Sequence, residues 1–540
     1  MLKKSISFFI ILVMMLTTFS ISVPSAGSKA FADTDSAVDS TVTIYAIYMK
    51  RASGSASASD RYGDAVLIQS DGKFLLMDTG AKAPLANSSK VYVSELVHTL
   101  KKIGVNELDV YISHLHKDHF GGLEAVCRNF KVNTLYMPDL NLCKDYETPT
   151  ISKSINAIYY EQAAKALKGL NGKNTRIVNL VPDVEGKRLH YDYDIDLQNS
   201  ELQYLSDTIQ FVGSESTGAS SVQVGSVSGR VIGPVGNYTV NQFASQDGID
   251  GTMEGHYLNN TSLVTMFDFG KVKFLTCGDI EKIEESKLAS KYGTNLGANI
   301  MKVSHHGIPT SSSNTFVSKV APIWSVNCDH GFTDKTTGRS THSRYGYYYG
   351  VASSKHTLII KVDGSSVRLY KDINNNGKID DAPLKGWVAS SGRYQYYSSS
   401  GLLQKGWTQV GSSKYYLAGK SGFRYTGSHK ISGVTCKFSS SGILTSPAKP
   451  TKVKIRNLSS TSTKVKIRWR KASRVSRYEI YRASSSSGKY TKIATVKSTA
   501  RSYTTAKPVK GKRYYFKVRA IRYTAGTTLY GSFSAAKRSR

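Results

Sequence analysis

Four residues of metal-binding type stand within six positions of this chain, and they constrain its fold more than any other feature. They are His114, His116, Asp118 and His119. Neutral imidazole and carboxylate are the donors that zinc and related divalent cations prefer. The four residues follow the hydrophobic segment 109–113, which predicts a strand. Because side chains at the carboxyl end of a strand converge on a crevice in α/β folds, we expect a metal site at the edge of an α/β domain.

The sequence around this cluster also predicts strands and hairpins. Short β-branched and aromatic runs alternate with longer segments from residue 33 to about residue 375, as in α/β proteins. The two predicted hairpins pair 65–69 with 73–77 and 262–267 with 271–276. The first contains Asp71-Gly72, a dipeptide typical of tight hairpin turns. The hairpins are followed by Asp78 and Asp279, and this repetition predicts two related half-domains.

A second histidine pair lies later in the chain. His305 and His306 follow the apolar segment 298–303 and precede a glycine. Alone, this pair would be weak evidence of a metal site. Together with the first cluster, it supplies further candidate metal ligands. Residues 281–291, which lie between Asp279 and this pair, predict a charged surface helix.

Together these motifs resemble the metallo-β-lactamase superfamily over about residues 42–370. The motifs, in the family's order, are Asp78-Thr79-Gly80, the block 114–122, Cys277-Gly278-Asp279 and Ser304-His305-His306-Gly307. The resemblance implies an αββα sandwich, in which two β-sheets carry helices on their outer faces and two divalent metal ions bind at one edge. Zinc is the metal that it favours, with manganese as the alternative.

The resemblance also implies a role for each residue of the site. The implied ligands are, for the first metal, His114 and His116 and, for the second, Asp118, His119 and His306. Asp279 would bridge the two metals, and Asp78 would orient the histidine loop. His305 competes with His306 for its place. Asp118 and Asp279 are the expected catalytic residues.

The sequence departs from the family pattern at the third ligand of the first metal. The family usually has a histidine before the second hairpin, where this chain has Asn260. Either the first metal keeps an extra water molecule, or His256 or His190 supplies the missing donor. Such an Asn is found in two branches that the chain resembles, secreted phosphorylcholine esterases and the hydrolase-like domain of competence DNA-uptake channels. The sequence of residues 63–68 also resembles that of both branches.

The N-terminus predicts export. Lys3 and Lys4 precede an apolar run from residue 6 to residue 23, and residues 30–32 have the small-residue pattern of a cleavage site. We expect residues 1–32 to be a signal peptide, with an uncleaved membrane anchor as the alternative. No comparable apolar run follows, so we expect no integral membrane association after cleavage.

Gly, Trp and Tyr blocks recur about every 20 residues between 376 and 447, which predicts an array of β-hairpins. The blocks resemble the cell-wall or choline-binding repeats of Gram-positive surface proteins, whose aromatic rings cage a quaternary ammonium. Gln395 and Lys414 replace the aromatic residue that normally precedes each Tyr pair. The repeats can therefore be interpreted either as a wall-binding module or as a structural spacer.

A partial calcium loop begins at Asp372. It lacks the Glu of its last position, where Pro383 stands. The alternatives are a weak calcium site near Asp372 and an Asn-Gly-rich turn.

The last segment, 448–540, predicts a β-sandwich that resembles fibronectin type III, with Trp469 in its core. The whole chain has a formal net charge of +33, and residues 451–540 contribute +24 of it, with 25 Lys and Arg against a single Glu. Basic exported domains bind polyanions by releasing counterions. We expect an anionic cell-wall polymer of the teichoic acid type, or a nucleic acid, as the partner; charge without a dedicated ligand is the alternative.

These features predict a secreted, cell-wall-associated metallohydrolase of Gram-positive type. The reaction that we expect first is cleavage of a phosphodiester, such as phosphorylcholine on a wall polymer, by a metal-bound hydroxide. An extracellular nuclease and a wall-binding adhesin without catalysis are the alternatives. Lys117 and His342 are further candidates for contact with the substrate.

Overall fold

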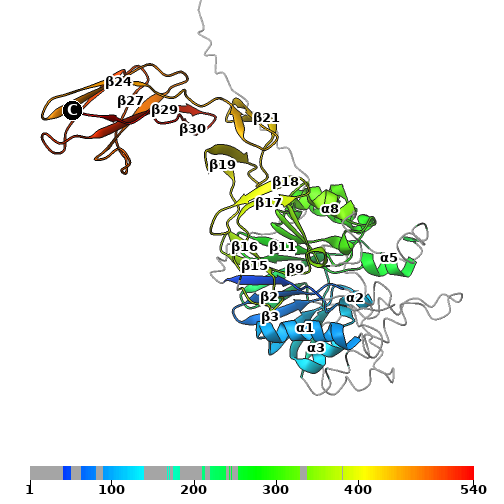
Figure 1. The fold of residues 1–540 in the computed structure, drawn as a ribbon. Helices are drawn as coiled ribbons and strands as arrows, with labels where there is room; N and C mark the ends of the chain where they lie inside the picture. The colour runs from blue at the N-terminus through cyan, green and yellow to red at the C-terminus, as the bar shows by residue number, and fades with distance from the viewer. Residues whose placement is uncertain are drawn as a thin grey trace, which may run out of the picture.

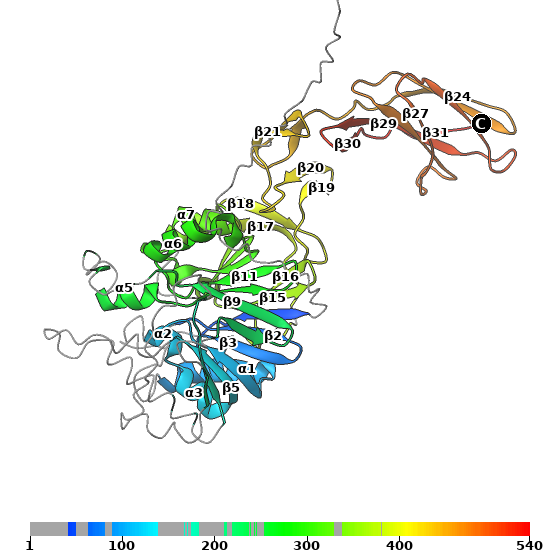
Figure 2. The same ribbon diagram turned by 180° about the vertical axis from the view of Figure 1, so that it is seen from behind.

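A computed structural model describes residues 41–49, 63–80, 89–138, 167, 170, 174–182, 210–212, 219–236, 238, 242–243, 245, 253–328, 337–379 and 381–540. The predicted signal peptide, 1–32, and His190 lie outside these ranges. Figures 1 and 2 show a large body, a row of small hairpins and a β-domain that extends away from the body at the C-terminal end. Among the described helices, none has both the length and the apolar character needed to cross a bilayer.

A nine-stranded sheet forms one half of the body. Its spatial order is β16 (Ser366–Asp372), β15 (Thr357–Asp363), β1 (Val42–Ala46), β2 (Val66–Ser70), β3 (Lys73–Met77), β4 (Glu107–Tyr111), β5 (Lys131–Met137), β6 (Arg176–Asn179) and β7 (Gln210–Val212). β2 and β3 confirm the first predicted hairpin; Asp71 and Gly72 have φ of 50° and 72°, as a tight turn requires. Strands β3 to β7 run parallel, so their carboxyl ends meet at one edge.

A seven-stranded sheet forms the other half. Its spatial order is β14 (Tyr347–Gly350), β13 (Trp324–Asn327), β12 (Ile300–Lys302), β11 (Lys273–Thr276), β10 (Val264–Asp268), β9 (Val227–Gly233) and β8 (Ser221–Val224). β10 and β11 confirm the second predicted hairpin. Strands β11 to β14 run parallel, so this sheet also gathers its carboxyl ends at one edge.

Helices lie against both sheets. They are α1 (Ser89–Ile103), α2 (Lys117–Phe120), α3 (Leu123–Asn129), α5 (Met253–Asn260), α6 (Lys282–Tyr292), α7 (Asn314–Val320), α8 (Thr337–His342) and α9 (Val351–Ser354), with 3-10 turns η6 (Gly293–Leu296) and η7 (Ser304–Gly307). Leu100 of α1 is buried with β3 and β4 of the first sheet, and Leu288 of α6 with β10 and β11 of the second. A third core contains Ile68 of β2 and Phe274 of β11, so residues of both sheets pack together there.

The charged helix α6 differs from the expectation of a surface helix. Glu284 and Glu285 are each 0% exposed. Glu284 accepts the Val235 N–H at 2.7 Å, and Glu285 accepts the Ser312 N–H at 2.7 Å. The carboxylates therefore bind unpaired amides of neighbouring loops, which the charge pattern of the helix does not reveal.

The predicted hairpin array is confirmed. It consists of β17 (Gly386–Ser390) with β18 (Arg393–Tyr397), β19 (Gly406–Val410) with β20 (Ser413–Leu417), and β21 (Gly427–Ile431) with β22 (Val434–Phe438) and β23 (Leu444–Ser446). The indole N–H of Trp324 in the body donates to the Tyr397 hydroxyl at 2.9 Å. The indole N–H of Trp407 donates to the Ala525 carbonyl of the C-terminal domain at 2.8 Å. The array is thus bonded to the body at one end and to the last domain at the other.

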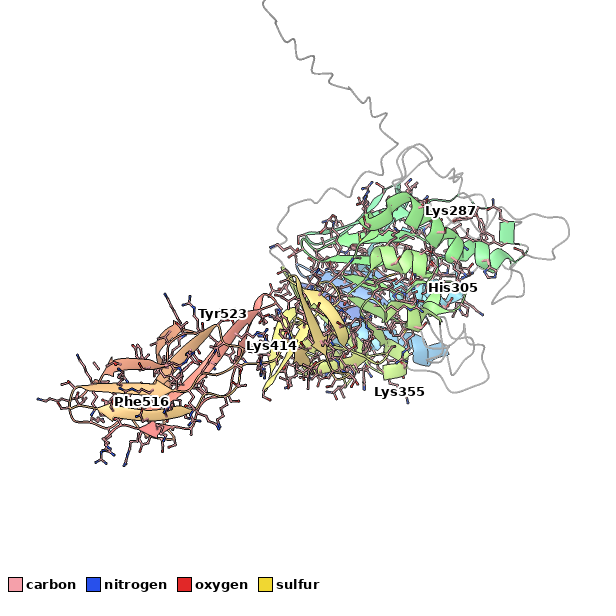
Figure 3. All side chains as sticks on the ribbon, turned by 90° about the horizontal axis from the view of Figure 1, so that it is seen from above. Lys287, His305, Lys355, Lys414, Phe516 and Tyr523 are labelled. Atoms are coloured by element: carbon pink, nitrogen blue, oxygen red, sulfur yellow. The ribbon has the colours of Figure 1, made fainter. Side chains whose placement is uncertain are left out.

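The C-terminal domain has two sheets around one core. One consists of β24 (Ile455–Ser460), β25 (Lys464–Trp469) and β28 (Ser502–Ala506), and the other of β27 (Thr491–Lys497), β26 (Arg477–Ala483), β29 (Tyr515–Thr524), β30 (Thr527–Tyr530) and β31 (Lys537–Arg538). Trp469 is 2% exposed and lies in the core with Tyr478 and Phe516, which confirms its predicted place. Figure 3 shows Phe516 in this domain and His305 in the body, with Lys414 between them.

Candidate metal centre

The histidine loop leads from the carboxyl end of β4 into α2. The backbone of the loop packs on the turn after β3: the Thr79 N–H donates to the His119 carbonyl at 2.6 Å. A Cβ at Gly122 would stand 2.2 Å from the Thr79 carbonyl oxygen, so this close approach requires glycine. His114 and His119 are buried, whereas His116 is partly exposed. The loop therefore has one face in the protein and one toward solvent.

The second histidine pair lies on η7, after β12. His305 and His306 adopt left-handed backbone with φ of 40° and 53°, a conformation that is rare outside glycine and clusters at functional sites. Asp279 follows β11, the neighbouring strand. Parallel strands thus bring Asp279 and His306 to one edge.

Donor atoms from these segments converge. His119 Nε2 lies 3.1 Å and His306 Nε2 lies 3.0 Å from Asp279 Oδ2. Asp118 Oδ2 lies 3.3 Å from His306 Nε2. Ligand atoms of Asp64, His119, Asp279 and His306, all buried, lie within 4.8 Å of one another. These atoms could hold a metal ion.

The other ring nitrogen of each histidine faces a further carboxylate. His119 Nδ1 lies 2.8 Å from Asp78 Oδ2, and His306 Nδ1 lies 3.6 Å from Asp64 Oδ1. An ionised carboxylate only accepts, so Nδ1 of His119 carries a proton. Burial disfavours a charged ring, but Asp279, Asp78 and Asp118 outweigh burial and raise the pKa of His119 well above its ordinary value. A metal at Nε2 would therefore take the place of a proton there. Asp78 also accepts the Ser113 N–H at 2.7 Å, which ties it to the start of the histidine loop.

His114 and His116 form a second pair of donors beside this group. His114 Nε2 lies 2.9 Å from His116 Nδ1, and the His114 and His119 ring centroids are 4.2 Å apart. Burial, with the neighbouring histidines, holds the pKa of His114 well below its ordinary value. Burial also lowers the pKa of His116 to about 4. Both rings are therefore neutral near pH 7, the state in which imidazole binds metals.

A buried lysine is part of the same centre. Lys302 contacts Asp64, and its Nζ lies 3.3 Å from Asp279 Oδ1 and donates to the Gly278 carbonyl at 2.9 Å. Burial disfavours the ammonium, but Asp64 and Asp279 outweigh burial and raise the pKa of Lys302. Burial likewise disfavours an ionised Asp118, yet His119 and His306 lower its pKa to about 2.

The donor set fits a divalent cation. Asp64, Asp78, Asp118 and Asp279 bring four carboxylates to this region, and Lys302 compensates only part of their charge. Nε2 of His119 is buried and makes no hydrogen bond in the described part of the chain. That nitrogen faces Asp279 Oδ2 at 3.1 Å, so a cation held by these two atoms would satisfy the buried nitrogen and offset the negative charge of the carboxylates.

Three of the sequence candidates meet elsewhere, at Glu281. Glu281 accepts from His256 Nδ1 at 2.8 Å and from the Asn260 amide at 3.1 Å, and its Oε1 lies 3.3 Å from His305 Nδ1. The Asn260 oxygen accepts the Glu281 N–H at 3.2 Å, so both ends of this amide are engaged. Burial raises the Glu281 pKa, but the hydrogen bonds of His256 and His305 outweigh it and lower the pKa to about 2.

His342 does not reach a surface from which it could contact a substrate. It is 0% exposed, and its Nδ1 lies 2.8 Å from Ser325 Oγ. Burial lowers its pKa to about 3, so it is a neutral core residue, and the expectation of substrate contact was wrong. Lys117, in contrast, is partly exposed on the histidine loop.

At the predicted calcium loop, Asp372 accepts the N–H groups of Asn376 at 3.0 Å and of Gly377 at 2.7 Å. Asp380, a further residue of the loop, lies outside the described residues. The calcium site stays a prediction.

The chain's own cations lie on the aromatic faces of the hairpin array. The Arg424 guanidinium carbon is 4.0 Å from the Tyr394 ring centroid and 5.6 Å from that of Trp387. Lys414 Nζ is 5.9 Å from the Trp407 ring centroid. Gln395 is 0% exposed and donates to the Ser421 carbonyl at 2.6 Å.

Two residues of the centre, Asp64 and Lys302, were missed as site residues from the sequence. Asp64 lies two residues before β2, and Lys302 ends β12, so each lies at or near the end of a strand. That position was the available indication, but many residues share it.

Comparison with known proteins gives partial matches. The family described as Anti-Pycsar protein Apyc1 matches residues 48–169. The chain is 43% identical over 72 residues to the Anti-Pycsar protein Apyc1 of Saccharibacillus brassicae, covering 13% of this chain and 25% of that protein. It is 37% identical over 68 residues to Competence protein ComA of Neisseria gonorrhoeae, covering 13% and 10%. The chain thus spans a quarter or less of the length of these relatives.

Among solved structures, choline binding protein F from Streptococcus pneumoniae is 26% identical, with a TM-score of 0.13, over 19% of this chain and 28% of that one. The chain is thus weakly similar to a competence protein, to Apyc1 and to a choline-binding protein.

Proposed function

We propose that this chain is a metal-dependent hydrolase of phosphodiesters whose active site is the cluster of the histidine loop, Asp279 and His306. The observation that carries the proposal is the convergence of His119 Nε2 and His306 Nε2 on Asp279 Oδ2, with Nδ1 of each ring facing Asp78 or Asp64. A carboxylate behind each histidine is the arrangement that positions metal-binding imidazoles. The partial similarity to Apyc1 and to a competence protein supports a hydrolase-like class.

The proposal extends to the architecture. We assign residues 33–375 to an αββα sandwich of the metallo-β-lactamase type, which the shared core of the two sheets and the helix-lined outer cores support. Residues 376–447 are assigned to repeats of the cell-wall-binding type, and residues 448–540 to a fibronectin type III-like domain.

The proposed ligands are His114 and His116 for one metal, Asp118, His119 and His306 for the other, and Asp279 between them. Zinc matches the mixed nitrogen and oxygen donors, with manganese as the alternative. Such metals, when bound, supply a hydroxide nucleophile at neutral pH and stabilise charge on phosphoryl oxygens.

The chain's own residues prepare this chemistry. Asp78 keeps the proton of His119 on Nδ1, so Nε2 faces the reaction side. Lys302 keeps Asp64 and Asp279 ionised by compensating part of their charge. His116 and Asp118 are partly exposed, and they mark the face through which a substrate enters.

The proposed substrate is a phosphodiester of a cell-wall polymer, such as phosphorylcholine, and the proposed location is the outside of a Gram-positive cell. The charge of the last domain also favours a second candidate, an extracellular nuclease, because nucleic acids bind basic domains. A wall-binding adhesin without catalysis is the third.

One set of assays separates these functions. The full chain is incubated with bis-p-nitrophenyl phosphate, p-nitrophenyl phosphorylcholine and plasmid DNA, each with and without EDTA. We expect EDTA-sensitive cleavage of the synthetic diesters, lost in His119→Ala and kept in His98→Ala, since His98 is exposed on α1. Nicking of plasmid instead would favour the nuclease. If the chain cleaves none of the three substrates and binds less than one metal ion per chain, the wall-binding adhesin is the remaining function.

A further inference from the structure

The turn that carries the second histidine pair has a strained backbone. His305, His306 and Gly307 have φ of 40°, 53° and 75° in succession. Glycine tolerates this left-handed region, and α8 restrains Gly307 further, since a Cβ at Gly338 would stand 2.5 Å from Gly307 Cα. A histidine in this region persists only where its surroundings fix it. His306 Nε2 lies 3.0 Å from Asp279 Oδ2, so a change in the His306 backbone would move this nitrogen away from the candidate metal centre.

Asn327, the last residue of β13, bonds directly to this backbone. Its side-chain amide nitrogen, Nδ2, donates to the His306 carbonyl at 2.8 Å and to the Tyr348 hydroxyl at 2.8 Å. A carbonyl oxygen only accepts, so the nitrogen of the amide, and not its oxygen, must face His306. β13 is the parallel neighbour of β12, and this pairing brings Asn327 beside η7, which follows β12.

The amide oxygen of Asn327 is buried without a hydrogen bond. Asn327 is 6% exposed, and its Oδ1 has no hydrogen-bond partner among the described residues. A buried polar atom without a partner destabilises a fold. An apolar side chain of similar size would therefore suit this position better if the position served packing alone. The contact of Nδ2 with the His306 carbonyl gives the amide its use.

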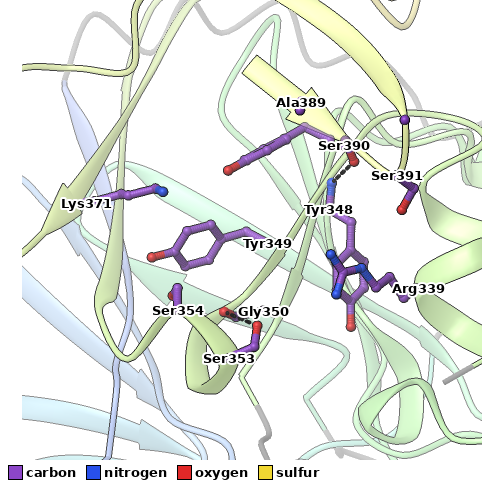
Figure 4. A pocket seen from close by; sticks show the side chains of 12 residues that line it. Arg339, Tyr348, Tyr349, Gly350, Ser353, Ser354, Lys371, Ala389, Ser390 and Ser391 are labelled. Atoms are coloured by element: carbon purple, nitrogen blue, oxygen red, sulfur yellow. Dashed lines mark hydrogen bonds between the residues drawn. The ribbon is translucent and has the colours of Figure 1, made fainter. Parts of the chain in front are cut away.

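Tyr348, the second acceptor of Asn327, is itself anchored. Its N–H donates to Ser390 Oγ at 3.1 Å, and the Arg339 guanidinium carbon lies 6.0 Å from its ring centroid. Figure 4 shows these three residues in the wall of a pocket of about 510 Å³, where the body meets the first hairpin. Because Tyr348 is fixed, the amide of Asn327 is held in one orientation.

We infer that Asn327 is a positioning residue of the candidate metal centre. Its amide holds the left-handed backbone of His306 and thereby keeps the His306 ring beside Asp279. The inference rests on the proposed function for the use of that ring as a metal ligand. The positioning itself is a property of the metal-free chain, so it is tested with and without metal.

Diethyl pyrocarbonate, which modifies accessible imidazoles, tests the positioning in the full chain in EDTA. Peptide mass spectrometry follows the rate at His306, which is 6% exposed. We expect Asn327→Leu to raise this rate about five- to tenfold, the population shift that the loss of one hydrogen bond produces. Asn327→Ala should do the same and removes any clash of the leucine side chain. The matched control is Ser325→Ala, also on β13, which removes a buried hydrogen bond to His342 and should leave the rate at His306 unchanged.

Zinc affinity, measured by competition with a chromophoric chelator, is the second readout. We expect Asn327→Leu to lower it about tenfold or more, as for other residues that orient metal ligands, and Ser325→Ala to leave it unchanged. In the His306→Ala background, Asn327→Leu should cause no further loss, because its effect passes through that ring.

Equal reactivity of His306 in the wild type and in both Asn327 variants would overturn the inference. The same holds if Ser325→Ala raises the reactivity as much as they do, or if Asn327→Leu lowers zinc affinity equally with and without His306. If the wild type binds no metal, the proposed function fails, and the reactivity of His306 alone decides whether Asn327 positions it.

Discussion

Two carboxylates, Asp78 and Asp64, face the Nδ1 atoms of two different histidines of the candidate centre. Asp78 is in hydrogen-bond contact with His119, and Asp64 lies close to both His306 and Lys302. Asp78 has a φ of 57°, so its backbone is held in the left-handed region that Asp and Asn tolerate better than other residues. At the scale of single residues, the site therefore depends on groups that need not touch a metal themselves.

Asp78→Asn tests this dependence. Asparagine tolerates the same backbone but removes the charged acceptor of the His119 Nδ1 proton. We expect metal affinity to fall about 10- to 100-fold, the usual effect of losing such a partner. Competition with a chromophoric chelator measures the affinity. Asp109→Asn, on β4, removes a carboxylate that accepts the Thr134 N–H, and it should leave the affinity unchanged; equal losses in both variants would contradict the prediction.

Lys302→Met addresses the charge balance of the same centre. Without the ammonium, Asp64 and Asp279 are buried carboxylates with less compensation, and breaking such a pair costs about 3–5 kcal/mol. We expect a large drop in the free energy of unfolding of the metal-free chain and a larger stabilisation by added metal than in the wild type. Urea unfolding with EDTA and with zinc measures both. Lys282→Met, at an exposed position of α6, is the control, and similar effects of the two variants would refute the role of Lys302.

At the scale of elements, α6 buries carboxylates that its sequence suggested were exposed, and an arginine of the hairpin array lies on aromatic rings. Glu284 of α6 binds the loop at Val235, and its pKa is raised to about 7 mainly because it is buried. In the array, Arg424 covers Tyr394 and Trp387. In both cases the partner comes from another element.

Glu284 makes stability depend on pH. Because its pKa is higher in the folded chain than the ordinary value of 4.5, the folded state binds the proton more tightly. This contribution is complete below pH 4.5 and is lost as the pH rises toward 7, about 3 kcal/mol in all. Urea unfolding between pH 4.5 and 7.5 should show this decline in the wild type, and Glu284→Gln should lack it, although the variant is less stable throughout. Parallel pH profiles for the two proteins would be the contrary result.

From the position of Arg424 we predict how the hairpins respond to choline. A guanidinium on Trp387 and Tyr394 occupies the faces that would bind a quaternary ammonium, an attraction of about 0.5–2 kcal/mol. We expect millimolar choline to leave the tryptophan fluorescence of the wild type unchanged and to quench that of Arg424→Ala. Lys420→Ala, at an exposed position of the turn after β20, should behave as the wild type does. Choline quenching in the wild type itself would show that the faces are open.

At the scale of the whole molecule, the positive charge is concentrated in one domain at the far end from the metal centre (Figures 1 and 3). Lys464 and Lys466 of β25 are exposed and alternate with the buried Val465 and Ile467. Glu479, the single acidic residue after position 450, is 5% exposed, and Arg519 lies 2.7 Å from it. The outer surface of the domain therefore carries uncompensated positive charge.

This distribution predicts salt-sensitive binding to polyanions. Between 50 and 200 mM NaCl, the affinity of the full chain for an anionic wall polymer should fall about a hundredfold or more, because bound counterions are released. The double variant Lys464→Glu, Lys466→Glu should reduce both the affinity and the salt slope. Lys101→Glu, on exposed α1 of the body, is the matched control. Binding that is insensitive to salt, or equally weakened by the control, would exclude the basic domain as the binding surface.

What could be predicted from the sequence is what depends on local spacing. Asp71-Gly72 requires a tight turn, Trp469 stands at an apolar position of an alternating strand, and His114 to His119 follow a strand directly. These properties depend on neighbours within a few residues, and the sequence alone determined them, together with the uneven placement of charge.

The tertiary structure alone decided which distant residues meet. Asp64 and Lys302 are far apart in sequence, yet they pair because β2 and β12 belong to two sheets that pack on a common core. The same packing places His306 at the metal centre and His305 at Glu281, although they are adjacent in the chain. A buried charge needs a compensating partner, and only the packing of elements determines which partner lies within reach.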